Sequence, residues 1–576
     1  MSRKFTHKSN SPQKKSGIFP LSPLLQGITV VVLTLAVCIP SLHNGFVNWD
    51  DNLYIYENLS LLQGNAVSYI LEPIQGNYHP VTQATLWLDY KLFGLEARGY
   101  HGSSSLWHAL AALLSWLLAW RLSGNVVLSM FVGLGFGIHP LHVESFAWTS
   151  GRKDLVYAVF SLACLLSWRG WLNTRSIGLL GWGIGFFFLA LFSKPMAVVL
   201  PLLMLLVSGF QAGVLSFNWT SIITGRRWVV PILLLLPAIG VAWATFVAQG
   251  NYGAIRQVEG LNIWDNLQIS AYGLFFYFTR GMLPMHLSAL HPYPPIGNGL
   301  PSIFLLSFIG VGVSIALLYY FRNKIERYLP GLLWVGICLA PVLQLIPVGS
   351  AIVADRYFYL AAWGFLFSLG LLVENLVKNP KFGMAVLCIL VISWMYGTMR
   401  RISVWKDGNT LFSNVLNEYP GNPTAANNLG NWLEKQNRYA EACAYYEMAV
   451  NSKPDFAQAL FNLALCRQKS GKTEEAKQLN FLALAEMPKF PDAWNNLGTI
   501  YGSLGQLDSA KWALERAISL KPEYAAAWNN LGMYYLGSAQ MDSARICFER
   551  SAGLDKNPES DARRNLQYLK EADGFR

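Results

Sequence analysis

The chain has 576 residues, of which 53% are hydrophobic and 13% are charged, and its formal net charge is +11. Such a composition excludes a soluble globular protein for most of the length. Nucleic acid is not an expected partner either, because the basic residues lie in short loops between apolar runs, where they set membrane topology. The seven cysteines have no metal-ligand spacing, so we expect neither a metal site nor a disulfide framework.

Apolar stretches of membrane-spanning length fill most of the chain before residue 400. The first, at 24–42, follows a basic segment (1–23) and is typical of an uncleaved signal anchor with a cytoplasmic N-terminus. The others lie at 104–120, 125–141, 155–172, 177–193, 196–210, 229–248, 302–321, 330–348, 356–376 and 383–399. The expected fold class is therefore all-α, with a polytopic membrane helical bundle of about eleven spans over 24–400.

The segment 266–284 decides the predicted topology. It is rich in aromatic residues but holds Arg280 and Pro284. If it does not cross the membrane, nearly every basic loop cluster falls on one face, as the positive-inside rule requires. If it crosses, the last two clusters are on the wrong side. We therefore expect an interfacial or re-entrant segment, which places the first loop (43–103) and everything after 399 outside the cytoplasm.

After residue 400 the sequence repeats with a period of 34 residues. The pair Leu429-Gly430 recurs as Leu463-Ala464, Leu497-Gly498 and Leu531-Gly532. The spacing Trp494-x2-Leu497-Gly498-x2-Tyr501 fits helix A of a tetratricopeptide (TPR) repeat. We expect a linker helix at 401–421, four TPR repeats forming an α-solenoid at 422–557, and a capping helix and tail at 558–576.

Asparagine follows the same period on the predicted A helices, at Asn428, Asn462, Asn496 and Asn530. Such a ladder suits the binding of an extended protein or peptide acceptor, because amide side chains hydrogen-bond a polypeptide backbone. The alternative is that asparagine is simply common at this TPR position. The sequence favours neither interpretation.

Two adjacent carboxylates, Asp50 and Asp51, follow the first span directly. Side by side at a membrane surface, they suit a bound cation, or a general base whose pKa is raised by its neighbour. A helix cap or turn is the structural alternative, because aspartate is common at both.

Further polar residues fall in the loops predicted to lie outside. The segment His139-Pro140-Leu141-His142-Val143-Glu144 has too few ligands for a metal site and predicts hydrogen bonding near a site. Arg152 and Lys153 run against the positive-inside bias, which indicates an anionic partner such as a lipid phosphate. Lys194 suits a phosphate contact or snorkelling equally well, and Asp355-Arg356-Tyr357 suits either a phosphate contact or an internal ion pair.

Taken in this order, the motifs resemble those of one family. They are Trp49-Asp50-Asp51, Tyr100-His101, His139-Pro140-x-His142-Val143-Glu144, Ser150-Gly151-Arg152-Lys153-Asp154, Ser193-Lys194 and Ala354-Asp355-Arg356-Tyr357. Nearly the whole chain is similar to the transmembrane-and-TPR-repeat-containing proteins and their bacterial relatives, whose membrane domains are GT-C type glycosyltransferases. The resemblance implies sugar transfer from a polyprenyl-phosphate donor to an extracytoplasmic protein acceptor, and the eukaryotic relatives are O-mannosyltransferases.

The resemblance also implies roles for individual residues. Asp50 or Asp51 is the expected catalytic carboxylate. The expected donor-phosphate ligands are Arg152, Lys153, Lys194 and Arg356. The residues expected to line the site are His79, His139, His142, Glu144, Asp355 and Tyr357. His79 stands where relatives often have arginine, and Pro195 where an acidic residue is common. No metal or other cofactor is expected, because a lipid-phosphate leaving group does not demand one.

The expected setting is a bacterial inner membrane with periplasmic repeats, and an ER membrane with lumenal repeats is the alternative. The expected partners are the polyprenyl-phosphate donor, the protein acceptor and the lipid bilayer. A TPR membrane scaffold with a degenerate, inactive GT-C body is the main functional alternative. A transporter is less favoured, because few charges lie inside the spans and no internal symmetry is evident.

Overall fold

The computed structural model describes residues 22–210, 219–224, 226–251, 261–294, 299–347, 349–555, 557 and 559–574. Residues 1–21 of the predicted cytoplasmic segment (1–23) lie outside the described residues. The chain divides into two compact units, Met1–Leu411 and Phe412–Arg576, which we call the membrane unit and the repeat unit.

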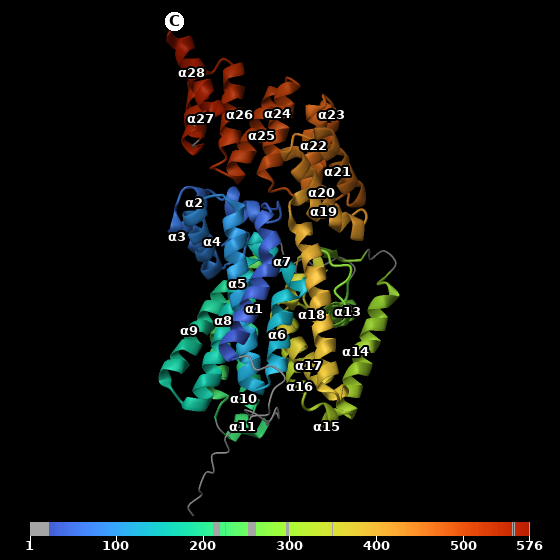
Figure 1. Ribbon diagram of the computed structural model, residues 1–576. Helices are drawn as coiled ribbons and strands as arrows, with labels where there is room; N and C mark the ends of the chain where they lie inside the picture. Colours follow the sequence, from blue (N-terminus) through green and yellow to red (C-terminus); the bar gives the residue numbers. More distant parts are fainter. Residues whose placement is uncertain are drawn as a thin grey trace, which may run out of the picture. The chain divides into compact units, whose positions relative to one another are not determined.

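The membrane unit is a bundle of helices, as expected (Figure 1). Its longer helices are α1 (Pro23–Cys38), α4 (Pro80–Phe93), α5 (Ala97–Ser123), α6 (Val126–Ile138), α8 (Arg152–Thr174), α9 (Ile177–Ser193), α10 (Leu200–Gly209), α12 (Val229–Asn251), α13 (Ile263–Met282), α14 (Ser302–Tyr320), α16 (Leu329–Leu339), α17 (Ala361–Leu376) and α18 (Pro380–Ile402). Its shorter helices are α2 (Leu59–Leu62), α3 (Ala66–Leu71), α7 (Val143–Ala147), α11 (Trp219–Thr224) and α15 (Arg322–Ile325). Strands β1 (His291–Pro292) and β2 (Ala351–Val353) pair antiparallel, with His291 opposite Val353.

Six helices among the described residues are long and apolar enough to cross a membrane. They are Pro23–His43, Ala97–Ser123, Thr149–Thr174, Val229–Gly250, Ser302–Tyr320 and Pro380–Trp405. A bent pair, Val126–Ile138 with Pro140–Ala147, qualifies as a seventh, and four shorter apolar helices accompany them. The eleven predicted spans fall on these helices one by one, but the count of eleven stays a prediction because four of the helices are short.

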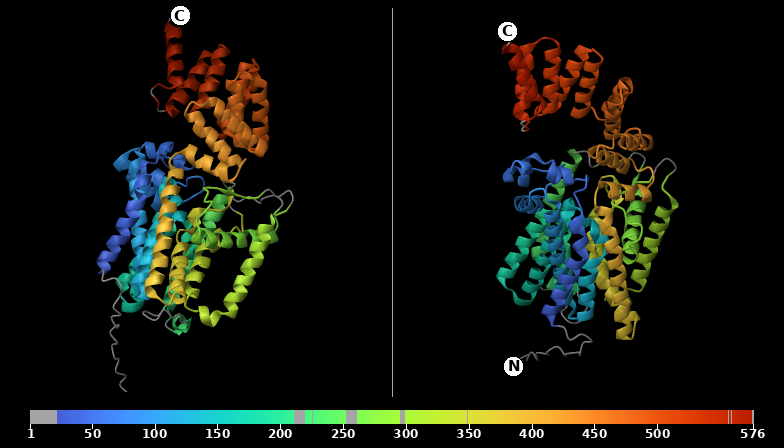
Figure 2. Two further views of the ribbon diagram at one scale, coloured as in Figure 1. Left: turned by 45° about the vertical axis from the view of Figure 1, so that its right-hand side comes forward. Right: turned by 45° about the horizontal axis from the view of Figure 1, so that its top comes forward.

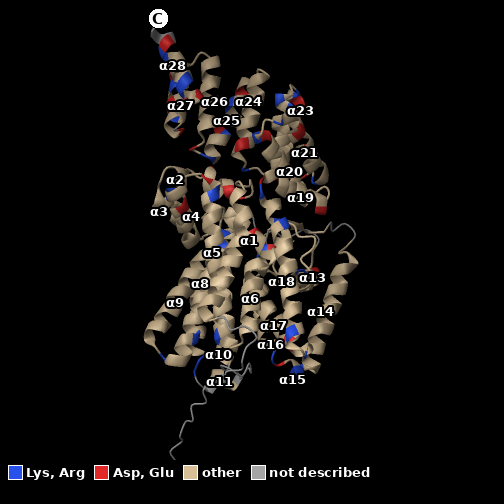
Figure 3. Ribbon diagram, in the orientation of Figure 1, with Lys and Arg blue, Asp and Glu red and all other residues tan. Residues whose placement is uncertain are grey.

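The segment 266–284, on which the topology depends, is part of α13. This helix has 20 residues and begins with a capping box between Asn262 and Asp265. It is not among the helices long and apolar enough to span. Figure 3 shows basic residues gathered at the end of the bundle where α11 and α15 lie, with few charges along the middle of the helices. Both observations agree with a non-crossing α13, although the side of the membrane stays a prediction.

Small residues bring the bundle helices into close contact. A Cβ atom at Gly331 of α16 would overlap α17, and a Cβ at Gly364 of α17 would overlap α16. Close approach through small residues is the usual means of helix packing in membranes, where lipid supplies no hydrophobic driving force. Helix α14 differs, because only Phe304 and Ser307 are buried along it. Figure 2 shows it splayed away from the other helices of the bundle.

The repeat unit consists of antiparallel helix pairs. The pairs are α20 (Pro423–Lys435) with α21 (Tyr439–Ser452), α22 (Ala457–Lys469) with α23 (Thr473–Glu486), α24 (Pro491–Ser503) with α25 (Leu507–Leu520), and α26 (Ala525–Gly537) with α27 (Met541–Leu554). Helix α19 (Gly408–Glu418) precedes them and α28 (Asp561–Gly574) follows. The glycine of the 34-residue period has a steric reason. A Cβ at Gly430, Gly498 or Gly532 would overlap a large side chain of the second helix of the same pair.

One expectation about the repeat unit is wrong. Cys443 of α21 and Cys466 of α22 form a disulfide, with their Cα atoms 5.8 Å apart. No local sequence signal indicates this pair, because the two cysteines are 23 residues apart and lie in different repeats. Only the packing of α21 against α22 brings them together.

Candidate active site

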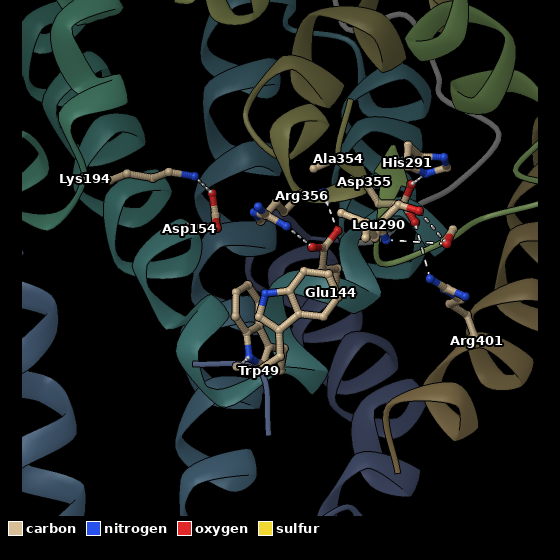
Figure 4. Close-up of polar contacts among 12 residues, drawn as sticks. Trp49, Glu144, Asp154, Lys194, Leu290, His291, Ala354, Asp355, Arg356 and Arg401 are labelled. Atoms are coloured by element: carbon tan, nitrogen blue, oxygen red, sulfur yellow. Dashed lines mark hydrogen bonds and ion pairs between the residues drawn. The ribbon is translucent and has the colours of Figure 1, made fainter. Parts of the chain in front are cut away.

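The candidate site lies where four parts of the membrane unit meet. The first loop contributes Trp49, Asp50 and Asp51, and the start of α8 contributes Lys153. Lys194 follows α9 directly. Arg356 belongs to the short 3-10 helix η7 (Asp355–Phe358). Figure 4 shows Lys194, Arg356 and Trp49 in this region together with the carboxylates that bind the two cations.

Asp51 is a buried acceptor of hydrogen bonds. One carboxylate oxygen accepts the backbone N–H of Val47 at 3.0 Å. The other accepts the backbone N–H of Ser150 at 2.9 Å and its hydroxyl at 2.6 Å. Burial raises the pKa of Asp51 to about 7, although the hydrogen bonds from Ser150 and Val47 oppose this increase. Asp51 therefore joins the first loop to the turn that precedes α8.

Asp50 has a different environment. Its side chain is partly exposed, and its backbone φ is +64°, in the left-handed region that few non-glycine residues adopt. The surrounding structure maintains this conformation. The Trp49 carbonyl accepts the indole N–H of Trp148 at 2.8 Å, and the Asp50 carbonyl accepts the N–H groups of Leu53 and Tyr54 at 2.9 Å. Strained residues of this kind are concentrated at functional sites.

Three of the four predicted phosphate ligands share aromatic neighbours. The Lys153 ammonium lies 5.0 Å from the Trp148 ring centre, and the Arg356 guanidinium lies 5.4 Å from the same ring. The Tyr357 ring lies 5.0 Å from Arg356 and 5.5 Å from the Lys194 ammonium. Trp148 and Tyr357 thus lie between the three cations, which we call the cation cluster (Lys153, Lys194 and Arg356).

Two members of the cation cluster have buried counter-ions. Lys194 forms an ion pair with Asp154, and Arg356 forms one with Glu144. Glu144 also accepts the backbone N–H of Arg356 at 3.0 Å. Among the described residues, no carboxylate forms an ion pair with Lys153, although it lies near enough to Asp50 for their charges to interact. Lys153 is therefore the least neutralised cation of the three.

Arg152, the fourth predicted phosphate ligand, does not join the cation cluster. Its guanidinium is completely buried and forms an ion pair with Asp89 at 2.7 Å. It also donates to the Ser104 hydroxyl and the Tyr100 carbonyl, both at 2.9 Å. Consecutive helical residues point in directions about 100° apart, so Arg152 and Lys153 serve different regions. This geometry does not support the expected phosphate contact and assigns Arg152 to the packing of α8 on α4 and α5.

His79 lies near Lys153 and Lys194 of the cation cluster, whereas His139 and His142 contact backbone carbonyls of other segments. Burial and the nearby charges of Lys153 and Lys194 hold the pKa of His79 well below its usual value. One ring nitrogen of His139 lies 2.9 Å from the Gly281 carbonyl, and one of His142 lies 2.7 Å from the Phe136 carbonyl. Both histidines are fully buried between helices. That they line the site stays a prediction.

Sequence reasoning missed two partners of Asp355. The buried Asp355 carboxylate lies 3.4 Å from His291 and 3.7 Å from Arg401. His291 belongs to strand β1, and Arg401 lies near the end of α18. The pairing of β1 with β2 brings His291 beside η7, and no local sequence signal reveals this contact. Among the described residues, no group of three or more His, Cys, Asp or Glu side chains is arranged to hold a metal.

The predicted asparagine ladder in the repeat unit connects neighbouring repeats. Asn462 donates to Asn427 at 2.8 Å and to Asn431 at 3.0 Å. Asn530 donates to Asn495 at 2.9 Å. Of the other two predicted members, Asn428 lies 3.5 Å from its neighbour, and Asn496 accepts a long bond from a threonine hydroxyl. The side-chain amides of Asn462 and Asn530 therefore bind neighbouring repeats. A protein or peptide acceptor that binds the ladder must either displace these hydrogen bonds or form further ones beside them.

Comparisons with known proteins agree with this architecture. Tetratricopeptide repeat family models match residues 424–452, 458–479, 491–524 and 525–558. Protein O-mannosyl-transferase TMTC3 of Mus musculus is 24% identical over 481 residues, which cover 74% of this chain and 51% of that protein. The chain is similar to the TMTC proteins over most of its length. Protein O-mannosyl-transferase F38B6.6 of Caenorhabditis elegans, also 24% identical, is matched over 66% of this chain and 54% of its own length.

The TMTC relatives are longer proteins, and this chain spans about half the length of the curated relatives it matches. Among solved structures, a crystal structure of MamA aligns with 25% of this chain and with 84% of its own length. The aligned residues are 25% identical and the TM-score is 0.23. The alignment with TMTC3 covers 74% of this chain, far more than the repeats occupy. The similarity to the TMTC proteins therefore extends over the membrane unit as well as the repeats.

Proposed function

We propose that this protein transfers a mannosyl group from a polyprenyl-phosphate donor to a hydroxyl group of a protein acceptor outside the cytoplasm. The observation that supports this best is the cation cluster beside Asp50, at the edge of a helical membrane bundle. Three cations around two aromatic rings suit a phosphate group attached to a lipid. The TMTC relatives are named protein O-mannosyl-transferases, which supports the type of reaction.

Asp50 is the proposed general base. It is partly exposed, whereas both oxygens of Asp51 already accept hydrogen bonds from Val47 and Ser150. In the proposed step the Asp50 carboxylate takes the proton of the acceptor hydroxyl, and the hydroxyl oxygen attacks the anomeric carbon. The bond between that carbon and the phosphate oxygen breaks, and its electron pair leaves with the polyprenyl phosphate. Asp51 is a positioning residue that fixes the loop on which Asp50 lies.

The cation cluster is proposed to stabilise the leaving phosphate. Lys153 is the principal ligand, because Arg356 and Lys194 are already paired with Glu144 and Asp154. Preorganised charges are most effective where negative charge develops during the reaction. The buried carboxylates hold Arg356 and Lys194 in place, so little reorganisation is needed when the donor binds.

The repeat unit is proposed to bind the acceptor on the same side of the membrane as the site. Two independent observations support an extracytoplasmic location, which in a bacterium is the periplasm. Basic residues gather at the opposite end of the bundle (Figure 3). The Cys443–Cys466 disulfide suits an oxidising compartment, because disulfides rarely persist in the cytosol.

The decisive experiment is a transfer assay with the purified protein in lipid nanodiscs and radiolabelled mannosyl-phosphoryl-polyprenol. Transfer of label to envelope proteins and slow release of free mannose are measured for the wild type and for Asp50→Asn. We expect both signals to fall by about 100-fold or more in the variant. Equal, background-level signals in both proteins would contradict the proposal and favour a TPR membrane scaffold with an inactive GT-C body.

A further inference from the structure

Each residue of Ala354-Asp355-Arg356 is bound by a different segment of the membrane unit, and Figure 4 shows the contacts of Asp355 and Arg356. The backbone N–H of Ala354 donates to the Tyr277 hydroxyl, and the Ala354 carbonyl accepts from it, both at 3.1 Å. Glu144 binds Arg356 through its backbone N–H and its guanidinium. Asp355, between them, lies within ion-pair distance of two more basic residues. The short helix that holds Arg356 is thus fixed on both sides.

Arg401 is the unexpected member of this network. Its side chain is 7% exposed, and one guanidinium nitrogen lies 3.7 Å from the Asp355 carboxylate. Another donates to the Leu287 carbonyl at 2.9 Å. Arg401 therefore connects α18 both to η7 and to the loop that leads to strand β1. The neighbouring Arg400 is exposed, and among the described residues its side chain reaches Tyr396 of its own helix, whose hydroxyl lies 3.4 Å away.

Charge burial explains why Arg401 matters to its surroundings. Asp355 is 1% exposed, and a buried carboxylate is tolerated only when cations or hydrogen-bond donors compensate it. If Arg401 is removed, His291 remains 3.4 Å from the carboxylate, but unlike arginine it carries a positive charge only when it is protonated. The Asp355 carboxylate must then move toward water or toward another cation. Because Arg356 is the next residue, such a shift displaces the backbone on which its guanidinium depends.

We propose that Arg401 is a positioning residue for the donor phosphate, which acts through Asp355 on Arg356. This inference rests on the proposed function and adds to it a residue from the last helix of the membrane unit. It predicts that loss of Arg401 weakens donor binding more than the chemical step, because Glu144 still holds the Arg356 charge near the site. A rise in KM with little change in kcat is expected when a substitution weakens binding of the substrate and of the transition state by the same amount.

The test compares Arg401→Ala with Arg400→Ala, a matched removal of one arginine from the adjacent position of the same helix. For each protein in nanodiscs we would measure kcat and KM for the donor, and the Kd of polyprenyl phosphate without a sugar. We expect Arg401→Ala to raise both KM and Kd by about tenfold, and kcat to change by less than about threefold. Arg401→Lys restores the charge and should recover part of the loss. Arg400→Ala should match the wild type.

A double-mutant comparison shows whether Arg401 acts through Arg356. In an Arg356→Ala background, Arg401→Ala should have almost no further effect on the Kd of polyprenyl phosphate. The same tenfold effect in both backgrounds, or equal behaviour of Arg401→Ala and Arg400→Ala, would overturn the inference while the proposed function survives. If the wild type itself binds no polyprenyl phosphate, the proposed function fails and the inference fails with it. If Arg401→Ala does not fold, Arg401→Lys and Asp355→Asn decide between these outcomes.

Discussion

The Asp51 carboxylate accepts both the backbone N–H and the hydroxyl of Ser150, at 2.9 Å and 2.6 Å, although the two residues are 99 positions apart. These two hydrogen bonds tie Asp51 to the turn that precedes α8, and they explain how the two adjacent aspartates have separate tasks. Both carboxylate oxygens of Asp51 accept hydrogen bonds from the protein, whereas Asp50 remains partly accessible beside Lys153. Mutations that look equivalent in the sequence should therefore have different effects.

Asp50→Asn and Asp51→Asn should be distinguishable by stability. Asp50→Asn should abolish sugar transfer and leave the melting temperature within about 2 °C of the wild type, because a surface change away from packed groups costs little. Asp51→Asn should lower the melting temperature by several degrees, because its amide N–H₂ must face a donor, the N–H of either Val47 or Ser150. Differential scanning fluorimetry on detergent-solubilised protein measures both. A larger loss of stability for Asp50→Asn would contradict the assignment.

The raised pKa of Asp51 predicts how stability depends on pH. Its folded-state pKa is about 7 and its ordinary value is 3.8, so the folded protein holds the proton more tightly than the unfolded chain. Stability should fall as pH rises between about 4 and 7, with a slope of up to ~1.4 kcal/mol per pH unit from this group, and change no further above that range. Melting temperatures measured across pH should fall less steeply in Asp51→Asn than in the wild type, because the variant lacks the contribution of this one group.

Arg152 and Lys153 form a second pair of neighbours with separate tasks. Arg152→Ala leaves the Asp89 carboxylate, itself 4% exposed, without its cation and should destabilise the protein by about 3–5 kcal/mol. Lys153→Ala should leave stability nearly unchanged and raise the donor KM by about tenfold, because no carboxylate of the described residues depends on an ion pair with this side chain. Thermal unfolding together with steady-state kinetics of both variants provides the comparison. If Arg152→Ala raises the donor KM without loss of stability, the assignment of Arg152 to helix packing is wrong and Arg152 contributes to donor binding.

The sequence indicated the two units correctly because their signals are periodic and local. Apolar runs identify the bundle, and the spacing from Gly430 to Gly532 identifies the repeats, since each glycine lies against the second helix of its own pair. Local motifs named Lys153, Lys194 and Arg356, which the fold brings together around Trp148 and Tyr357. They also named Arg152, which the fold places elsewhere, because a run of two basic residues does not show which way each side chain points. They missed His291 and Arg401, because these residues meet Asp355 only through the tertiary fold.

The Cys443–Cys466 disulfide provides the last prediction, which concerns both stability and topology. Replacing the two cysteines by serine should lower the unfolding free energy of the repeats by about 2–4 kcal/mol, because the bond constrains the unfolded chain. In membranes prepared without a thiol-blocking reagent, a Cys443/Cys466 protein that lacks its other cysteines should react with a maleimide only after denaturation and reduction.

The matched control for this labelling is the same protein with Cys466→Ser, which should react after denaturation alone. The physical reason is that a periplasmic pair is oxidised, whereas a cytosolic pair is kept as thiols by the cellular reductants. Labelling of both cysteines without reduction would place the repeat unit in the cytoplasm. The acceptor-binding role would then fail together with the predicted topology, because α13 would have to cross the membrane and the repeats would lie on the opposite side from Asp50.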